Sequence, residues 1–127
     1  MTRDERISLF TRDLTALSLA DDGFVIFNPP HDEDTYAQFS RRSGEPIFCE
    51  VSNRSEGWNA HSLDAAQIAE LRALGYEIPS PHHQASPNKE FNGDVNVLVQ
   101  EAERIFRNVF REPEDYAVVS SGVEREA

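Results

Sequence analysis

The chain of 127 residues carries 12 lysines and arginines against 23 aspartates and glutamates, which gives a formal net charge of −11 at pH 7. This charge opposes binding to nucleic acid and to anionic membranes, and it favours a basic or apolar polypeptide as the partner. The N-terminal segment MTRDERISLF has acidic residues where a signal peptide has an apolar run, and no segment reaches membrane-spanning length, so we expect a cytoplasmic protein.

The first predicted element is an amphipathic helix near the N-terminus. Thr2 and Glu5 match a capping box, in which the hydroxyl accepts a first-turn N–H and the carboxylate reaches back. Four apolar residues at three- and four-residue steps predict one buried stripe: Ile7, Phe10, Leu14 and Leu17. Three polar residues are expected to face water: Arg6, Arg12 and Asp13. The turn residues 21–23, Asp-Asp-Gly, end this helix.

Three strands are predicted next. Residues 24–27, Phe-Val-Ile-Phe, are too few for a helix, and their uniform apolarity indicates a strand covered on both sides or lying against a partner. Residues 36–41 and 47–53 flank a short connection that contains a glycine, which is typical of a β-hairpin. Alternation places Phe39, Cys49 and Val51 on an inward face. The opposite, mixed face carries Tyr36, Gln38, Phe48 and Glu50.

A second helix has clear start and stop signals. Asp64 and Gln67 form another capping box, and Gly75 stands where a left-handed residue ends a helix, with Tyr76 beyond it as the apolar contact. A short strand is predicted at 76–78, and residues 79–87 form a polar loop with three prolines. A further short strand is possible at 89–91.

The last and longest amphipathic segment starts at Asp94 and is closed by Pro113. Its apolar stripe consists of Val95, Leu98, Ala102, Ile105 and Val109. Residues 116–119 can form a terminal strand, and residues 120–127 are expected to be a flexible tail. The sequence thus predicts one α+β domain, residues 1–119, with an antiparallel sheet of four to five strands and three helices in the order α-β-β-β-α-β(-β)-α.

No catalytic or cofactor-binding motif is present. Cys49 is expected to be a buried, inert strand thiol, since burial raises the pKa of a thiol unless a positive neighbour intervenes, and no nucleophile elbow or glycine-rich phosphate loop accompanies it. His82 and His83 are adjacent, so their rings diverge, and neither has a ligand partner at a usual metal spacing. The acidic run 32–34 lacks the ligand spacing of a calcium loop. We therefore expect no catalytic residue, no metal and no cofactor.

Three strings carry a family resemblance: YAQFSRRSGEPIFCEVSN, LDAAQIAELRALGYEIP and ERIFRNVFREP. Within residues 36–113 they resemble the YbjN and type III secretion chaperone-like superfamily, TY-Chap, whose members commonly have Leu-Gly-Trp where this chain has Leu-Gly-Tyr at 74–76. The chain departs from the family pattern in its longer loop at 79–87. The resemblance implies an α+β fold with helices on a sheet, frequent dimers, and the holding of an extended client peptide.

Together these features predict a non-enzymatic chaperone or adaptor that holds a client segment. The alternative is a regulatory or immunity-type protein that recognises a folded partner. The client site is expected on the mixed sheet face and at the edges of the sheet, where an extended peptide can add as a strand, with Tyr36, Gln38, Phe48 and Glu50 as its residues. Against this stands the possibility that a helix covers the face and makes these residues part of the core. We also expect a homodimer, and no nucleic-acid or membrane partner.

Overall fold

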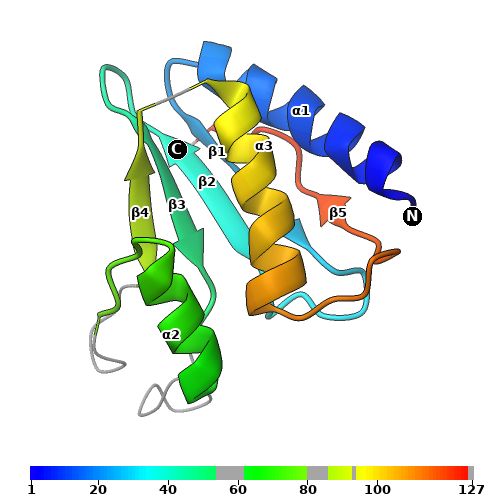
Figure 1. The fold of residues 1–127 in the computed structure, drawn as a ribbon. Helices are drawn as coiled ribbons and strands as arrows, with labels where there is room; N and C mark the ends of the chain where they lie inside the picture. The colour runs from blue at the N-terminus through cyan, green and yellow to red at the C-terminus, as the bar shows by residue number, and fades with distance from the viewer. Residues whose placement is uncertain (54–61, 80–85, 93, 126–127) are drawn as a thin grey trace.

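The computed structural model describes residues 1–53, 62–79, 86–92 and 94–125. Their elements follow the chain in this order (Figure 1): α1 (Arg3–Leu19), β1 (Gly23–Asn28), β2 (Ala37–Arg41), β3 (Ile47–Val51), α2 (Ala65–Ala73), β4 (Asn88–Phe91), α3 (Val95–Arg104), the π-helical turn η2 (Ile105–Val109) and β5 (Val119–Ser120). This confirms the predicted α+β class with three helices and an antiparallel sheet.

Both predicted capping boxes are present. The Glu5 N–H donates to Thr2 Oγ1 at 3.1 Å while the Thr2 N–H donates to Glu5 Oε1 at 3.0 Å. Asp64 and Gln67 make the same reciprocal pair at the start of α2, with both distances 2.8 Å. At the end of α2, Gly75 adopts a φ of 92°. Local side-chain chemistry therefore fixes where these two helices begin and where α2 ends.

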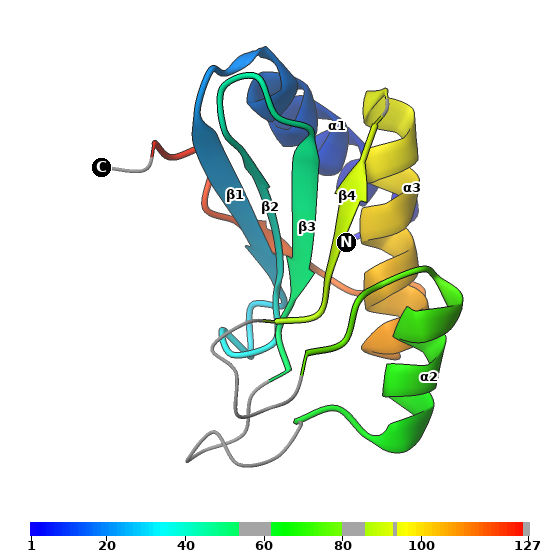
Figure 2. The same cartoon turned by 90° about the vertical axis from the view of Figure 1, so that its left-hand side faces the viewer.

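The sheet has the strand order β4-β3-β2-β1-β5, and every neighbouring pair is antiparallel. β1, β2 and β3 follow one another as two hairpins, and β4 and β5 add the outer strands. Figure 2 shows that α1 and α3 lie on one side of this sheet, while the part of the chain that the structure describes places no helix on the other side. Within the described ranges, the sheet therefore has one face covered by helices and one open face.

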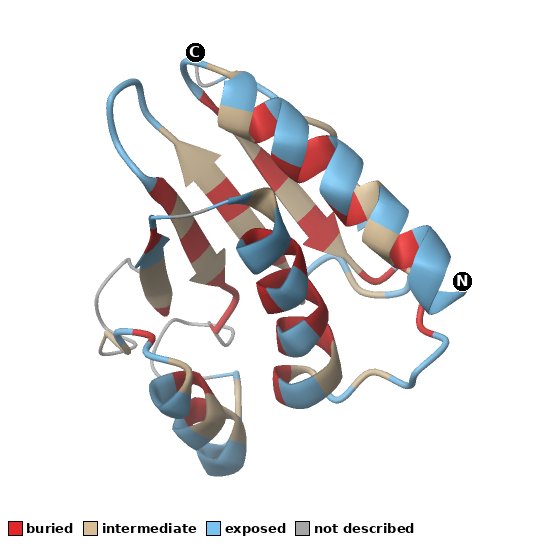
Figure 3. Cartoon of the chain, turned by 45° about the horizontal axis from the view of Figure 1, so that its top comes forward, coloured by how far each residue is buried: buried red, intermediate tan, exposed pale blue. Residues whose placement is uncertain are grey.

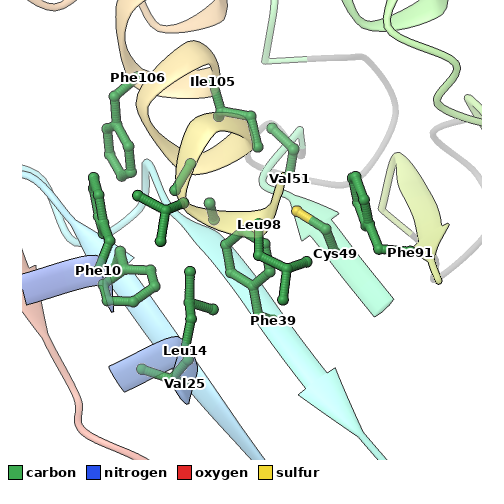
Figure 4. Packing of buried hydrophobic residues seen from close by; sticks show 14 of the residues in the cluster. Phe10, Leu14, Val25, Phe39, Cys49, Val51, Phe91, Leu98, Ile105 and Phe106 are labelled. Carbon is green, nitrogen blue, oxygen red and sulfur yellow. The ribbon is translucent and has the colours of Figure 1, made fainter. Parts of the chain in front are cut away.

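The core lies between the covered face and the two long helices (Figure 4). Phe10 of α1 meets the Phe27 ring edge-on at a centroid distance of 4.9 Å, and it stacks with Phe106 at 6.2 Å. Of the predicted core residues, Ile7 and Val95 are half-buried. The others are buried: Phe10, Leu14, Leu17, Phe39, Cys49, Val51, Leu98, Ala102, Ile105 and Val109. Figure 3 shows the buried stripe along α1 and α3.

The prediction that Arg6 and Asp13 face water is wrong. Arg6 is completely buried, and its guanidinium donates two hydrogen bonds to the Glu103 carboxylate, at 2.7 and 3.1 Å. Asp13 is 6% exposed and accepts a hydrogen bond from the Ser120 hydroxyl. Both lie on the flank of α1 that faces α3 and the C-terminal segment. Partners about one hundred residues away in the chain, which helical periodicity does not reveal, bury them.

Three other elements differ from the sequence prediction. The strand expected at 76–78 is reduced to a single bridge between Glu77 and Asn88. The expected long last helix changes at Ile105 from α3 to the π-helical turn η2. The expected tail from residue 120 instead pairs with β1, since the Ser121 N–H donates to the Ile26 carbonyl at 2.9 Å and Glu124 bridges Phe24. Without these residues β1 would present an unpaired edge, and the pairing covers it.

Candidate functional site

The open face of the sheet holds the side chains that alternate with the buried ones. Two rows cross it, because Ser40 of β2, Phe48 of β3 and Glu90 of β4 are in register, and Gln38, Glu50 and Asn88 form the next row. Gln38, Phe48 and Glu50 are half-buried. The structure therefore brings three of the four predicted site residues together on one face, and no described helix covers them.

Tyr36 lies just before β2 and is also half-buried. Its backbone continues the pairing with the end of β3, since its N–H donates to Ser52 Oγ at 2.8 Å and its carbonyl accepts from the Ser52 N–H at 3.0 Å. Tyr36 shares the sequence parity of Gln38 but is not among the residues that line the pocket on this face. It stands one row away from that pocket.

A pocket of about 540 Å³ lies on the open face. It is lined by Gln38, Ser40, Arg42, Glu45, Pro46, Phe48, Glu50 and Glu90. The small Ser40 side chain stands opposite Phe48 on the neighbouring strand. It fills little of the space beside the aromatic ring. This volume is within the range of about 300 to 1,000 Å³ that is typical of ligand-binding pockets.

The lining of the pocket is acidic. Three of its residues are glutamates, Glu45, Glu50 and Glu90, and Arg42 is the only cation among the described lining residues. The combination of an aromatic ring, carboxylates, an amide and a hydroxyl allows apolar contact and hydrogen bonding on one surface. This chemistry suits the binding of a side chain that is long and polar at its end.

Several of these residues were not predicted. Strand alternation could have added Ser40, which has the parity of Gln38. Glu45 and Pro46 belong to the connection between β2 and β3, whose path alternation does not describe. Glu90 comes from β4, and only the pairing of β4 with β3 places it beside Phe48. The acidic character of the pocket therefore depends on the tertiary structure.

The buried face carries a second polar cluster, around Cys49. The Tyr76 hydroxyl donates to Glu101 Oε2 at 2.8 Å and lies 3.4 Å from Cys49 Sγ. Burial is the main cause that raises the pKa of the Cys49 thiol well above its ordinary value. Cys49 is fully buried, so the thiol is neither ionised nor accessible at neutral pH. The prediction of a buried strand thiol is confirmed, and the cluster is part of the core.

Two sequence features were considered as metal sites, the acidic run 32–34 and the histidine pair, and the structure describes only the first. In the acidic run, Asp32 accepts hydrogen bonds from the Thr35 hydroxyl at 2.6 Å and from the Asp34 N–H at 3.0 Å, and the Thr35 bond is the main cause that lowers the Asp32 pKa. This carboxylate caps a turn. His82 and His83 lie outside the described residues. Across 1–53, 62–79, 86–92 and 94–125, no three metal-binding side chains come together.

None of the helices in the described ranges is long and apolar enough to cross a membrane.

Comparison with known proteins identifies a family. No curated protein and no solved structure matches the chain significantly. A family model described as "T3SS (YopN, CesT) and YbjN peptide-binding chaperone 3" matches residues 8–121, which include most of α1, all five strands and both further helices. The match confirms the resemblance seen in the sequence and extends it to the first helix and the last strand. The chain belongs to this family of peptide-binding chaperones, TY-Chap3.

Proposed function

We propose that this protein is a non-enzymatic chaperone or adaptor that holds an extended segment of a client polypeptide on the open face of its sheet. The observation that carries the proposal is the arrangement of the layers. The long helices pack on one face, and the other face presents half-buried Phe48, Gln38 and Glu50 around a pocket. Family membership supports a peptide as the ligand class.

The two edges of the sheet offer a client little free backbone, which makes the open face the more suitable main contact. Extended peptides often add as a strand to a free sheet edge. At β4, however, Glu77 already exchanges two backbone hydrogen bonds with Asn88, at 2.9 and 3.1 Å. At the other edge, β5 has only two residues. A client that adds to either edge finds little backbone to pair with, whereas the open face spans three longer strands, β1, β2 and β3.

Holding a peptide requires no bond-making chemistry. The groups of the open face act by apolar contact, hydrogen bonding and charge, and an acidic surface keeps a bound apolar or basic segment in solution. We infer on this ground, together with the family, that the protein works without catalysis and without a cofactor. A cytoplasmic location remains a prediction from the sequence.

A homodimer also remains a prediction. The acidic pocket disfavours the pairing of this face with a second copy of itself, because like charges would be brought together. We therefore expect a dimer to leave the open face free. Light scattering at high micromolar concentration checks the mass, and a monomer mass there would contradict the prediction while leaving the fold unchanged.

The test of the proposed function maps where a client binds. Partners captured from the protein's own cellular extract are cut into overlapping peptides, and each peptide is titrated against isotope-labelled protein by NMR. We expect shifts to concentrate on Gln38, Phe48, Glu50 and their neighbours. Phe48→Ala should weaken binding by at least about 1 kcal/mol if the ring is an anchor. Tyr36→Ala, one row away from the pocket, tests how far the site extends.

Leu19→Ala is the matched control, since it truncates an apolar side chain that is 81% exposed at the end of α1. It should leave peptide binding unchanged. Shifts confined to the helices would contradict the proposed face. Partners that bind only as folded proteins, with no peptide competing, would support a regulatory interaction protein instead. Loss of the melting transition in Phe48→Ala would identify Phe48 as a structural residue.

A further inference from the structure

The pocket on the open face contains features that select one kind of client residue. Phe48 is flanked across the strands by Ser40 and Glu90, and Glu50 is the next residue of β3 on the same side. Glu45, on the connection between β2 and β3, also lines the pocket. An aromatic ring thus lies within a group of three carboxylates from three separate segments.

We propose that this pocket receives an arginine side chain of the client segment, an inference that rests on the proposed function and specifies its ligand. The guanidinium can lie over the face of the Phe48 ring, and its forked N–H groups can donate to a carboxylate through two parallel bonds. The methylene stem of arginine suits the partly apolar lining that Phe48 and Pro46 supply.

The charge of the pocket favours an arginine side chain over the other possible occupants. The lining has three carboxylates and one guanidinium, and the whole chain has a formal charge of −11, so both the pocket and its surroundings attract a cation. An acidic segment would be repelled, and a second copy of this chain would bring the same negative surface. A purely apolar residue would remove water from the exposed carboxylates of Glu45 and Glu90 without replacing its hydrogen bonds, which costs free energy. Lysine fits the charge, but its ammonium lacks the planar fork.

The test uses a labelled peptide of about seven residues that alternates valine and threonine, so that one side can lie on a sheet face. Its central residue is arginine, and matched peptides carry citrulline, lysine or glutamate there. Citrulline has the shape of arginine without the charge. Fluorescence anisotropy measures affinity, and NMR shifts of the Ser40, Phe48 and Glu90 amides show where the peptide lies.

We expect the arginine peptide to bind about tenfold more tightly than the citrulline peptide. This preference should shrink as salt rises from about 50 mM to about 500 mM, because exposed charges are screened. Glu90→Gln should lower the arginine preference by about two- to fivefold, as expected for one partly exposed ion pair. Phe48→Leu should lower it as well, since it keeps an apolar residue and removes the ring. Glu33→Gln removes one charge from an exposed loop and should leave the preference unchanged.

The outcomes separate this inference from the function beneath it. Equal binding of the arginine and citrulline peptides with shifts on the open face would overturn the arginine pocket and leave peptide holding in place. The same holds for a preference for glutamate, or for an arginine preference that Glu90→Gln does not change. Failure of every peptide to bind would overturn both. Concentration-dependent shifts of the Ser40, Phe48 and Glu90 amides in the protein alone, with no arginine preference, would assign the face to self-association.

Discussion

The buried pair of Arg6 and Glu103 gives the sharpest prediction about stability. Glu103 of α3 accepts two hydrogen bonds from the Arg6 guanidinium, at 2.7 and 3.1 Å, and one from the Tyr116 hydroxyl at 2.8 Å. Arg6 also donates to the carbonyls of Met1 and Tyr116, and its guanidinium carbon lies 4.0 Å from the centre of the Tyr116 ring. One ion pair thus connects α1, α3 and the C-terminal segment.

Glu103→Gln keeps the shape and removes the charge, which leaves the buried guanidinium without its counter-ion and sets amide N–H groups against its own. Breaking one partner of a buried pair costs about 3 to 5 kcal/mol. The Glu103 side chain is 11% exposed, so water can partly solvate the site, and we expect the lower end, about 3 kcal/mol. Urea unfolding followed by circular dichroism at neutral pH measures this loss.

The double variant Arg6→Met with Glu103→Leu distinguishes the loss of the whole ion pair from the cost of leaving one buried charge without its partner. It removes both charges together, so it should cost less than Glu103→Gln by itself, even though the Tyr116 hydroxyl loses its acceptor. A loss of stability below about 1 kcal/mol in Glu103→Gln would refute the reasoning. So would a loss in the double variant equal to the sum of the losses in Arg6→Met and Glu103→Leu measured singly.

Acid provides a second measurement on the same pair. Burial acts to raise the Glu103 pKa, but hydrogen bonds from Arg6 and Tyr116 and the charge of Arg6 outweigh it, so the folded-state pKa lies below its ordinary value. The stabilisation is therefore complete above the unfolded-state pKa of about 4.3 and is lost as pH falls through the lower folded-state pKa. We expect the advantage of the native protein over Glu103→Gln to shrink with acidification, and an advantage that grows instead would contradict this sign.

Three further predictions concern the core and a helix end. Ile105→Asp places an unpaired charge at a fully buried site and should cost several kcal/mol, about 3 or more, so an unchanged cooperative melt would refute the assigned helix face. Gly75→Ala puts a Cβ on a residue with φ of 92° and should cost about 1 kcal/mol, whereas Gly75→Asn should cost less, because asparagine tolerates this conformation; equal losses in thermal unfolding would contradict the backbone explanation. Cys49, whose raised thiol pKa and burial keep it protonated, should react with iodoacetamide only in urea, and rapid alkylation of the native protein detected by mass spectrometry would show that the thiol is accessible.

Several features of this protein followed from the sequence because their causes are local. A capping box involves residues three apart, as at Thr2 and Glu5, and a helix that ends at Gly75 needs one residue with positive φ. Strand alternation has a period of two, so the parity of Gln38, Phe48 and Glu50 assigned them to one face before their strands were paired. The α+β class and most of the core followed from the same short-range patterns.

The candidate site was only half predictable. Alternation could indicate which side chains leave the core, but whether a helix covers them depends on how three helices distribute over two faces of a sheet. The structure places α1 and α3 on the same face, which is why Phe48 and its neighbours stay on an open one. Glu90 joins the pocket because β4 pairs with β3, although more than thirty residues of chain, about a quarter of the sequence, separate the two strands.

Only the tertiary structure decided that Arg6 and Asp13 are buried and that residues 119–124 pair with β1. Arg6 and Asp13 are polar residues beside an apolar stripe, and a helical pattern assigns such residues to water. Their partners Glu103 and Ser120 lie about one hundred positions further along the chain. Periodicity registers the neighbours of a residue within one or two turns, whereas burial of a charge depends on a counter-charge that folding brings from far away. The sequence by itself therefore determined most of the elements and their inward faces. Long-range pairing determined which polar groups are buried, and the packing of the helices determined which face of the sheet is open.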